Sequence, residues 1–295
     1  ADDDGSMVIV RGSLIRDNAA EAGGGINFYS DDEGRLKVID STISYNTAED
    51  GGGGIAFYND DGYIAIINST ISHNSAGPQG SGGGIRGWDA DDPTRIYHST
   101  IVFNYAGADV GGVYLEDGDL IVKNSIIAGN TTGAAGSFDI VPDSALNIYY
   151  SLVGELAATP DVDQGNIFSA EILLTTALKD VGGDTPVHPL KAGSPAIDAG
   201  QPGAIGQSND QRGTGYPRVR DGRVDIGAFE TDDADGDNVP AWMDAFPSDS
   251  GEDTDTDGDG VGDNADDFPS DPDEDTDTDG DGTGDNADAF PNDPS

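Results

Sequence analysis

Aspartates recur at a fixed step of 22 residues in the last part of the chain. In the second of three repeats, Asp255, Asp257 and Asp259 occupy positions 1, 3 and 5 of a loop, and Gly260 follows at position 6. A residue without a Cβ suits the sharp turn at that point. This spacing of oxygen ligands is that of an EF-hand-type loop, so the sequence predicts bound Ca²⁺.

The predicted ligand set extends to positions 7, 9 and 12 of each loop. The second loop offers a backbone carbonyl at 7 and carboxylates at 9 and 12, with Asp at 12 where EF-hands have Glu. The first loop is degenerate, because Asn238 replaces the glycine and Ala241 stands at position 9. The predicted metal ligands are Asp233, Asp235, Asp237, Asp244, Asp255, Asp257, Asp259, Val261, Asp263, Asp266, Asp277, Asp279, Asp281, Thr283, Asp285 and Asp288.

The composition of this segment also fits a solvated, disordered acidic tail. Residues 232–295 contain 24 Asp or Glu and no Lys or Arg, and they have little apolar surface to bury. The phased glycines, and the Phe-Pro pairs that begin at Phe246, Phe268 and Phe290, argue for ordered loops. We therefore expect the segment to order only when calcium offsets the repulsion among its carboxylates.

Residues 233–293 resemble the thrombospondin type 3 repeat in aspartate spacing, glycines and Phe-Pro pairs. Proline after each loop opposes continuation into a helix, so we do not expect the flanking helices of an EF-hand. The resemblance implies Asp-rich turns that wrap calcium, with the ions taking the place of a hydrophobic core.

A longer repeat fills the first half of the chain, with steps of 28, 28, 30, 26 and 26 residues between its serines. Three aliphatic columns accompany these serines. One lies two residues after each serine, and the other two lie three and five residues before it, with Thr94 as the one polar exception. The serines are Ser13, Ser41, Ser69, Ser99, Ser125 and Ser151. A further column consists of Asn18, Asn46, Asn74, Asn104 and Asn130.

Alternating β-branched residues at this period predict short strands stacked in successive coils, which is an all-β solenoid. The aliphatic columns would line its interior. The asparagine column would turn a corner, with each side-chain amide bonded to the next. The sequence therefore predicts a parallel β-helix.

Residues 6–230 resemble the bacterial right-handed parallel β-helix domains known as choice-of-anchor Q domains. The resemblance rests on the motifs DSTISYNTA with GGGI (residues 40–55), VGGDT (181–185), GSPAIDAG (193–200), DQRG (210–213) and DIGAFE (225–230). It implies a secreted or surface-anchored protein without enzymatic activity. We divide the chain into coils at 1–155, a closing segment at 156–231 and calcium-binding repeats at 232–295.

Charge and composition restrict the compartment and the partners. The net charge is −44, which disfavours nucleic acid and anionic membranes as partners. Cysteine is absent, and no apolar run reaches transmembrane length. Calcium loops of modest affinity suit the millimolar calcium outside cells, so we expect a secreted or cell-surface protein, with Ala1 as a candidate mature N-terminus after cleavage of a signal peptide.

Few residues suggest catalysis, and we expect no enzyme. Acidic turns at 31–33, 60–61, 89–92 and 116–117 could line a calcium- or sugar-binding edge, although solvated loop charge is the simpler interpretation. The three histidines show no metal-binding spacing, and His98 occupies a turn position. The mixed charges between Asp210 and Glu230 suggest buried ion pairs.

The alternative function is a polysaccharide-binding adhesin or a carbohydrate-active enzyme on the same scaffold. Exposed aromatics along one face would favour it, and the candidates are Phe28, Tyr29, Phe57, Tyr58 and Trp88. Packing of one member of each pair inside the coil would weaken it.

Self-association is a further expectation, because the end of a β-helix exposes unpaired strand backbone. If Ala1 is the true N-terminus, a second copy could cover that end, head to tail, and propagate a filament. The alternative is that upstream coils of a longer protein cover it.

Overall fold

The computed structural model describes residues 7–30, 34–59, 62–88, 92–134, 136–203, 206–220 and 222–294. The chain forms two compact units, Ala1–Leu190 with Ser194–Glu230, and Lys191–Gly193 with Thr231–Ser295. Over the described residues, every named regular element is a β-strand, and all of these strands belong to the first unit.

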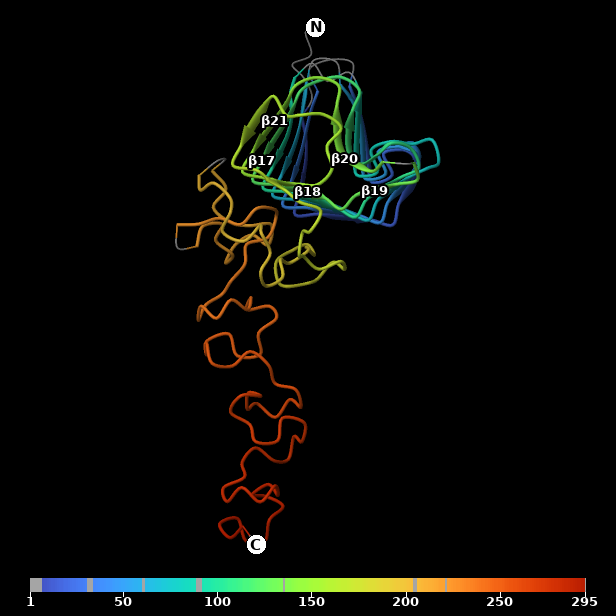
Figure 1. Cartoon of the computed structure of the whole chain (residues 1–295). Coiled ribbons are helices and arrows are strands. Elements are labelled where there is room, and N and C mark those ends of the chain that lie inside the picture. Colours follow the sequence, from blue (N-terminus) through green and yellow to red (C-terminus); the bar gives the residue numbers. More distant parts are fainter. Residues whose placement is uncertain are drawn as a thin grey trace. The chain divides into compact units, whose positions relative to one another are not determined.

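Four sheets of parallel strands run along the first unit, because each coil of the chain adds one strand to each sheet in turn (Figure 1). Sheet A contains β1 (Met7–Arg11), β5 (Arg35–Ile39), β9 (Tyr63–Ile67), β13 (Thr94–Tyr97), β17 (Leu120–Lys123), β21 (Leu146–Tyr149) and β23 (Val162–Gln164). Sheet B contains β2 (Leu14–Arg16), β6 (Thr42–Ser44), β10 (Thr70–Ser72), β14 (Thr100–Val102), β18 (Ile126–Ala128), β22 (Leu152–Val153) and β24 (Ile167–Phe168).

The other two sheets complete the coils. Sheet C contains β3 (Ala19–Ala22), β7 (Thr47–Gly51), β11 (Ser75–Ala76), β15 (Tyr105–Ala106) and β19 (Thr131–Thr132). Sheet D contains β4 (Ile26–Ser30), β8 (Ile55–Asn59), β12 (Ile85–Trp88), β16 (Val110–Leu115) and β20 (Phe138–Pro142). Strands β23 and β24 carry sheets A and B past residue 155, where we expected the closing segment to begin.

The aliphatic columns predicted from the sequence stack in register. Ile43, Ile71 and Ile101 pair along sheet B, and the column through Val38, Ile66 and Ile96 pairs along sheet A. Most of these side chains are fully buried in one continuous core. Thr94, the polar exception, is also buried. The predicted parallel β-helix is therefore confirmed.

Two hydrogen-bonded side-chain ladders mark the corners of the coil. From Ser41 onward, each serine hydroxyl accepts a bond from the backbone N–H of the serine one coil earlier, as in Ser41 N to Ser69 Oγ at 3.1 Å. Asn46 Nδ2 donates to Asn74 Oδ1 at 2.9 Å, and Asn74 Nδ2 donates to Asn104 Oδ1 at 3.0 Å. The predicted amide ladder is thus confirmed.

The asparagine ladder ends on a residue that the sequence pattern did not reveal. Asn130 Nδ2 donates to Asp139 Oδ1 at 2.7 Å, and Asp139 is buried at the start of the next stretch of sheet D. A carboxylate only accepts hydrogen bonds, which is what the last position of this ladder requires.

The closing segment covers the outer face of sheet B. Leu174, Leu190, Ala196 and Ile226 pack against side chains of β14, β18 and β22. Gln211 Nε2 donates to Thr42 Oγ1 at 2.7 Å, and Thr70 Oγ1 donates to Gln211 Oε1 at 2.7 Å. The central strands of sheet B are consequently buried on both faces, as the buried side chains of β6, β10 and β14 show.

Candidate metal centres

Three aspartate clusters in the second unit bring together the residues at positions 1, 3 and 5 of the predicted loops. Within each cluster, one carboxylate oxygen from each residue lies within 4.8 Å of the others. The clusters are Asp233 with Asp235 and Asp237, Asp255 with Asp257 and Asp259, and Asp277 with Asp279 and Asp281.

The backbone folds around the first aspartate of each loop. In the second loop, Asp255 Oδ1 accepts a bond from Gly258 N at 2.7 Å, and Oδ2 accepts one from Gly260 N at 3.1 Å. Gly260 has φ +95°, a conformation that favours glycine. Asn238 takes the equivalent place in the first loop with φ +75°, because asparagine tolerates positive φ better than most residues.

One carboxylate oxygen of the central aspartate in each cluster is buried without a hydrogen-bond donor. These oxygens are the Oδ2 atoms of Asp235, Asp257 and Asp279. Burial, together with the nearby carboxylates of Asp259, Asp266 and Asp255, raises the pKa of Asp257. Buried polar atoms are nearly always paired, and clustered carboxylates attract a hard, oxygen-preferring cation. The residues present therefore fit a calcium ion.

The aspartates at position 12 of the second and third loops lie close to these clusters. Asp266 is 8% exposed, and its charge contributes to the raised pKa of Asp257. The charge of Asp288 likewise contributes to the raised pKa of Asp279. Asp288 Oδ2 is buried without a hydrogen-bond donor. In the first loop, Asp244 Oδ1 accepts a bond from Phe246 N at 2.7 Å.

The aspartates at position 9 are held differently. Asp263 receives bonds from Thr256, at 2.8 Å from N to Oδ1 and 2.6 Å from Oγ1 to Oδ2. Asp285 receives the same two bonds from Thr278. Neither belongs to the three-aspartate clusters, which suits the water-mediated ligand that position 9 often supplies. At position 7, Val261 N and Thr283 N donate to Asp259 and Asp281.

Two glutamates that the ligand pattern did not single out connect successive repeats. Glu274 Oε2 accepts a bond from Asn286 N at 3.0 Å, and Asn286 Nδ2 donates to Asp273 O at 2.7 Å. Glu252 accepts the corresponding bond from Asn264 N at 3.1 Å. Both glutamates keep the 22-residue phase, so the period itself was the signal that could have identified them.

The mixed charges of the closing segment form a buried network. Arg212 Nη2 lies 2.6 Å from Asp210 Oδ2, and Arg218 Nη1 lies 3.6 Å from Glu230 Oε2. Asp225 N also donates to Glu230 Oε2. Burial raises the pKa of Glu230 to about 9. The predicted buried ion pairing is confirmed for Arg212 with Asp210.

The paired aromatics on sheet D separate into inner and outer members. Phe57 is fully buried in the core, and Phe28 packs against the core. Tyr29 and Tyr58 face outward and stack with ring centres 5.0 Å apart, and Trp88 follows Tyr58 in register. One member of each Phe-Tyr pair therefore lies inside the coil, which weakens the case for a sugar-binding groove. The acidic turns at 31–33, 60–61 and 89–91 lie outside the described residues.

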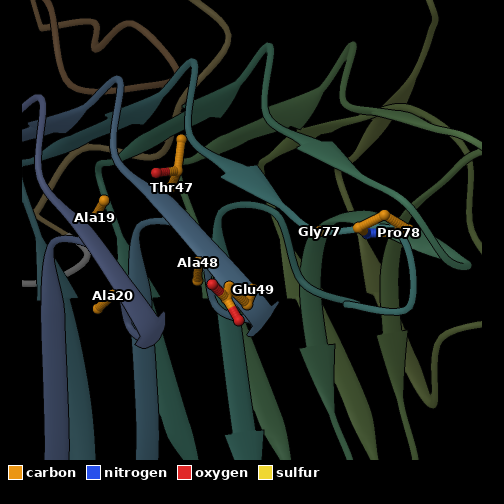
Figure 2. A pocket seen from close by; sticks show the side chains of 7 residues that line it. All are labelled: Ala19, Ala20, Thr47, Ala48, Glu49, Gly77 and Pro78. Atoms are coloured by element: carbon orange, nitrogen blue, oxygen red, sulfur yellow. The ribbon is translucent and has the colours of Figure 1, made fainter.

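A shallow groove on sheet C is lined mostly by small side chains (Figure 2). Its walls come from β3, β7 and the residues after β11, and they are Ala19, Ala20, Thr47, Ala48, Glu49, Gly77 and Pro78. Glu49 is its one charged side chain, so the groove has no set of convergent polar groups of the kind that fixes a ligand.

Comparison with known proteins supports the fold. Residues 2–150, half of the chain, match the sequence model of a family described as right handed beta helix region. The chain therefore belongs to the right-handed β-helix family. No curated protein and no solved structure matches the chain. Among the described residues, no helix is long and apolar enough to cross a membrane.

Proposed function

We propose that this chain is a calcium-binding structural protein of the cell exterior, and that the Asp-rich repeats order around Ca²⁺. The unpaired, buried carboxylate oxygen at the centre of each aspartate cluster supports this proposal most strongly. A calcium ion would satisfy that oxygen and offset the repulsion among the surrounding carboxylates.

The resemblances refine the proposal. The repeats would act as thrombospondin type 3-like modules, and the β-helix as a choice-of-anchor Q-like domain of a secreted or surface-anchored protein. The proposal includes no enzymatic activity, because the densest set of charged side chains outside the repeats, between Asp210 and Glu230, is buried in a hydrogen-bonded network. Buried structural networks of this kind shift pKa values without serving catalysis.

Calorimetric titration of the full chain with Ca²⁺ tests the proposal. We expect Asp257→Asn and Asp279→Asn each to remove or strongly weaken one binding site, since each supplies a central ligand oxygen. Asp249→Asn makes the same change of charge outside the clusters and should leave the stoichiometry unchanged. Wild-type protein that takes up no calcium at millimolar concentration would refute the proposal.

Glycan binding is the second candidate function, and the outward row of Tyr29, Tyr58 and Trp88 favours it. Aromatic side chains give rigid contact area with a polar edge, which suits amphipathic ligands. Binding to a panel of neutral polysaccharides should then be lost in Tyr58→Ser and retained in Tyr105→Ser, which changes an exposed tyrosine of sheet C. Equal binding by both variants would eliminate this candidate.

A further inference from the structure

Two histidines from distant parts of the sequence meet where the closing segment contacts the coils. His73 follows β10 in a turn, and His188 belongs to the closing segment. Their ring centres are 5.5 Å apart with an angle of 27° between the planes. Phe103 contacts both rings. Their separation in the sequence concealed this histidine pair from spacing rules.

Hydrogen bonding fixes the tautomer of His188. Its Nδ1 lies 2.8 Å from the backbone oxygen of Thr175. A carbonyl oxygen can only accept, so Nδ1 carries the proton and Nε2 presents a lone pair. His188 is 2% exposed, and Nε2 has no hydrogen-bond partner.

His73, the other histidine of the pair, also lacks a hydrogen bond. His73 Nδ1 is buried without a partner, and so is the hydroxyl of Thr175 beside His188. Three unpaired polar atoms thus belong to residues at one interface, although buried polar groups are usually satisfied.

The arrangement has two properties of a metal site. Metal-bound histidines usually donate their other ring N–H to a carbonyl or carboxylate, as His188 does to Thr175. Two imidazoles that bind one tetrahedral ion at about 2.0–2.1 Å have ring centres roughly 5 Å apart. The observed separation of 5.5 Å is close to that value.

We propose that His73 Nδ1 and His188 Nε2 bind a single divalent transition-metal ion of the imidazole-preferring class, such as Zn²⁺, Ni²⁺ or Cu²⁺. The ion would tie the closing segment to the coil that contains β10. This site is separate from the aspartate clusters, because Ca²⁺ prefers oxygen ligands. The competing interpretation is a purely aromatic stack that continues the column of Tyr45, His73 and Phe103.

Zinc titration of the full chain in millimolar Ca²⁺, which keeps the aspartate clusters occupied, tests the site. His73→Phe is the informative variant, because Phe103 occupies the equivalent turn with φ +58°, close to the +57° of His73. His98→Asn is the matched control, because Asn68 and Asn124 occupy equivalent turns to His98 with similar φ. We expect one Zn²⁺ per wild-type chain, affinity reduced by more than about 100-fold in His73→Phe, and no change in His98→Asn.

Ring NMR signals of the wild-type protein give a second measurement that needs no variant. Zinc should shift the signals of two of the three histidines. Absence of zinc binding in excess calcium, unchanged affinity in His73→Phe, or equal loss in His98→Asn would each overturn the site and leave the aromatic stack as the explanation.

Discussion

Single residues at the corners of the coil determine how the chain turns. The residue before each ladder serine or asparagine adopts positive φ, as in Asn68 (+53°) and Tyr45 (+56°). The ladder side chain then accepts the backbone N–H of its counterpart one coil earlier, as Asn74 Oδ1 does from Asn46 N at 3.0 Å. Hydrogen bonding between successive coils is thereby continued through the corners, where strand pairing stops.

Asn74→Asp should destabilise the β-helix. Asn74 Nδ2 donates to Ile43 O and Asn104 Oδ1, each at 3.0 Å, and a buried carboxylate would place charge against both acceptors. We expect the free energy of unfolding, measured by urea unfolding, to fall by an amount on the order of 3 kcal/mol or more. Asn147→Asp introduces the same charge on a half-buried outward position of β21 and should cost much less. Equal losses in the two variants would contradict the ladder's role.

Ile71→Asp tests the aliphatic column. Ile71 is fully buried between Ile43 and Ile101, so the variant places an unpaired charge in an apolar stack. We expect the free energy of unfolding to fall by more than about 4 kcal/mol, or the protein to fail to fold. Thr131→Asp, at an exposed position of β19, should fold normally. A folded, soluble Ile71→Asp protein would show that the inward face is assigned wrongly.

At the scale of elements, the closing segment acts as a cover for sheet B. Its contacts combine apolar packing with a buried network of three carboxylates and two guanidinium groups, from Asp210, Asp225, Glu230, Arg212 and Arg218. One proton on this set would balance its charge. The raised pKa of Glu230 is consistent with Glu230 holding that proton.

Glu230 should make stability depend on pH. Its pKa rises from 4.5 in the unfolded chain to about 9 in the fold, so the folded state binds more protons between these values. Its contribution is complete below about pH 4.5 and is lost as pH rises toward 9. Between pH 5 and pH 8 we expect the free energy of unfolding of the wild type to fall by an amount on the order of 3 kcal/mol. The Glu230→Gln variant should not show this fall.

Urea unfolding at both pH values, in constant calcium, measures this difference. Glu49→Gln removes an exposed carboxylate of β7 and serves as the control. Its stability should depend on pH as that of the wild type does. If Glu230→Gln retains the wild-type dependence, Glu230 is not the titrating group.

At the scale of the whole molecule, the two units rely on different interactions. The first has a continuous apolar core and paired strands. The second has aspartate loops in which many backbone N–H groups bond to carboxylates of the same repeat. Metal binding and folding should therefore be coupled in the second unit only.

Limited proteolysis with and without a chelator tests this difference. We expect a chelator to make the region after Glu230 sensitive to protease, because the repelling carboxylates lose their counterion, while the coils stay resistant. Equal resistance of the Asp-rich region in both conditions, or loss of the coils in chelator, would contradict the assignment. Head-to-tail self-association stays a prediction, which sedimentation velocity in calcium can test.

The sequence alone determined the features that repeat. The serine and aliphatic columns predicted the register of sheets A and B, because every coil needs the same residues at the same corners. The 22-residue period likewise located the aspartates that meet at positions 1, 3 and 5. These predictions succeeded because neighbouring repeats contact one another in a regular order.

Only the tertiary structure decided the features that do not repeat. Packing of the closing segment on sheet B, the end of the asparagine ladder at Asp139, and the meeting of His73 with His188 all join residues without a common period. Their partners are selected by burial and hydrogen bonding across the folded surface, which local spacing does not encode. The outward orientation of Tyr58 beside the inward Phe57 likewise depended on the strand pleat.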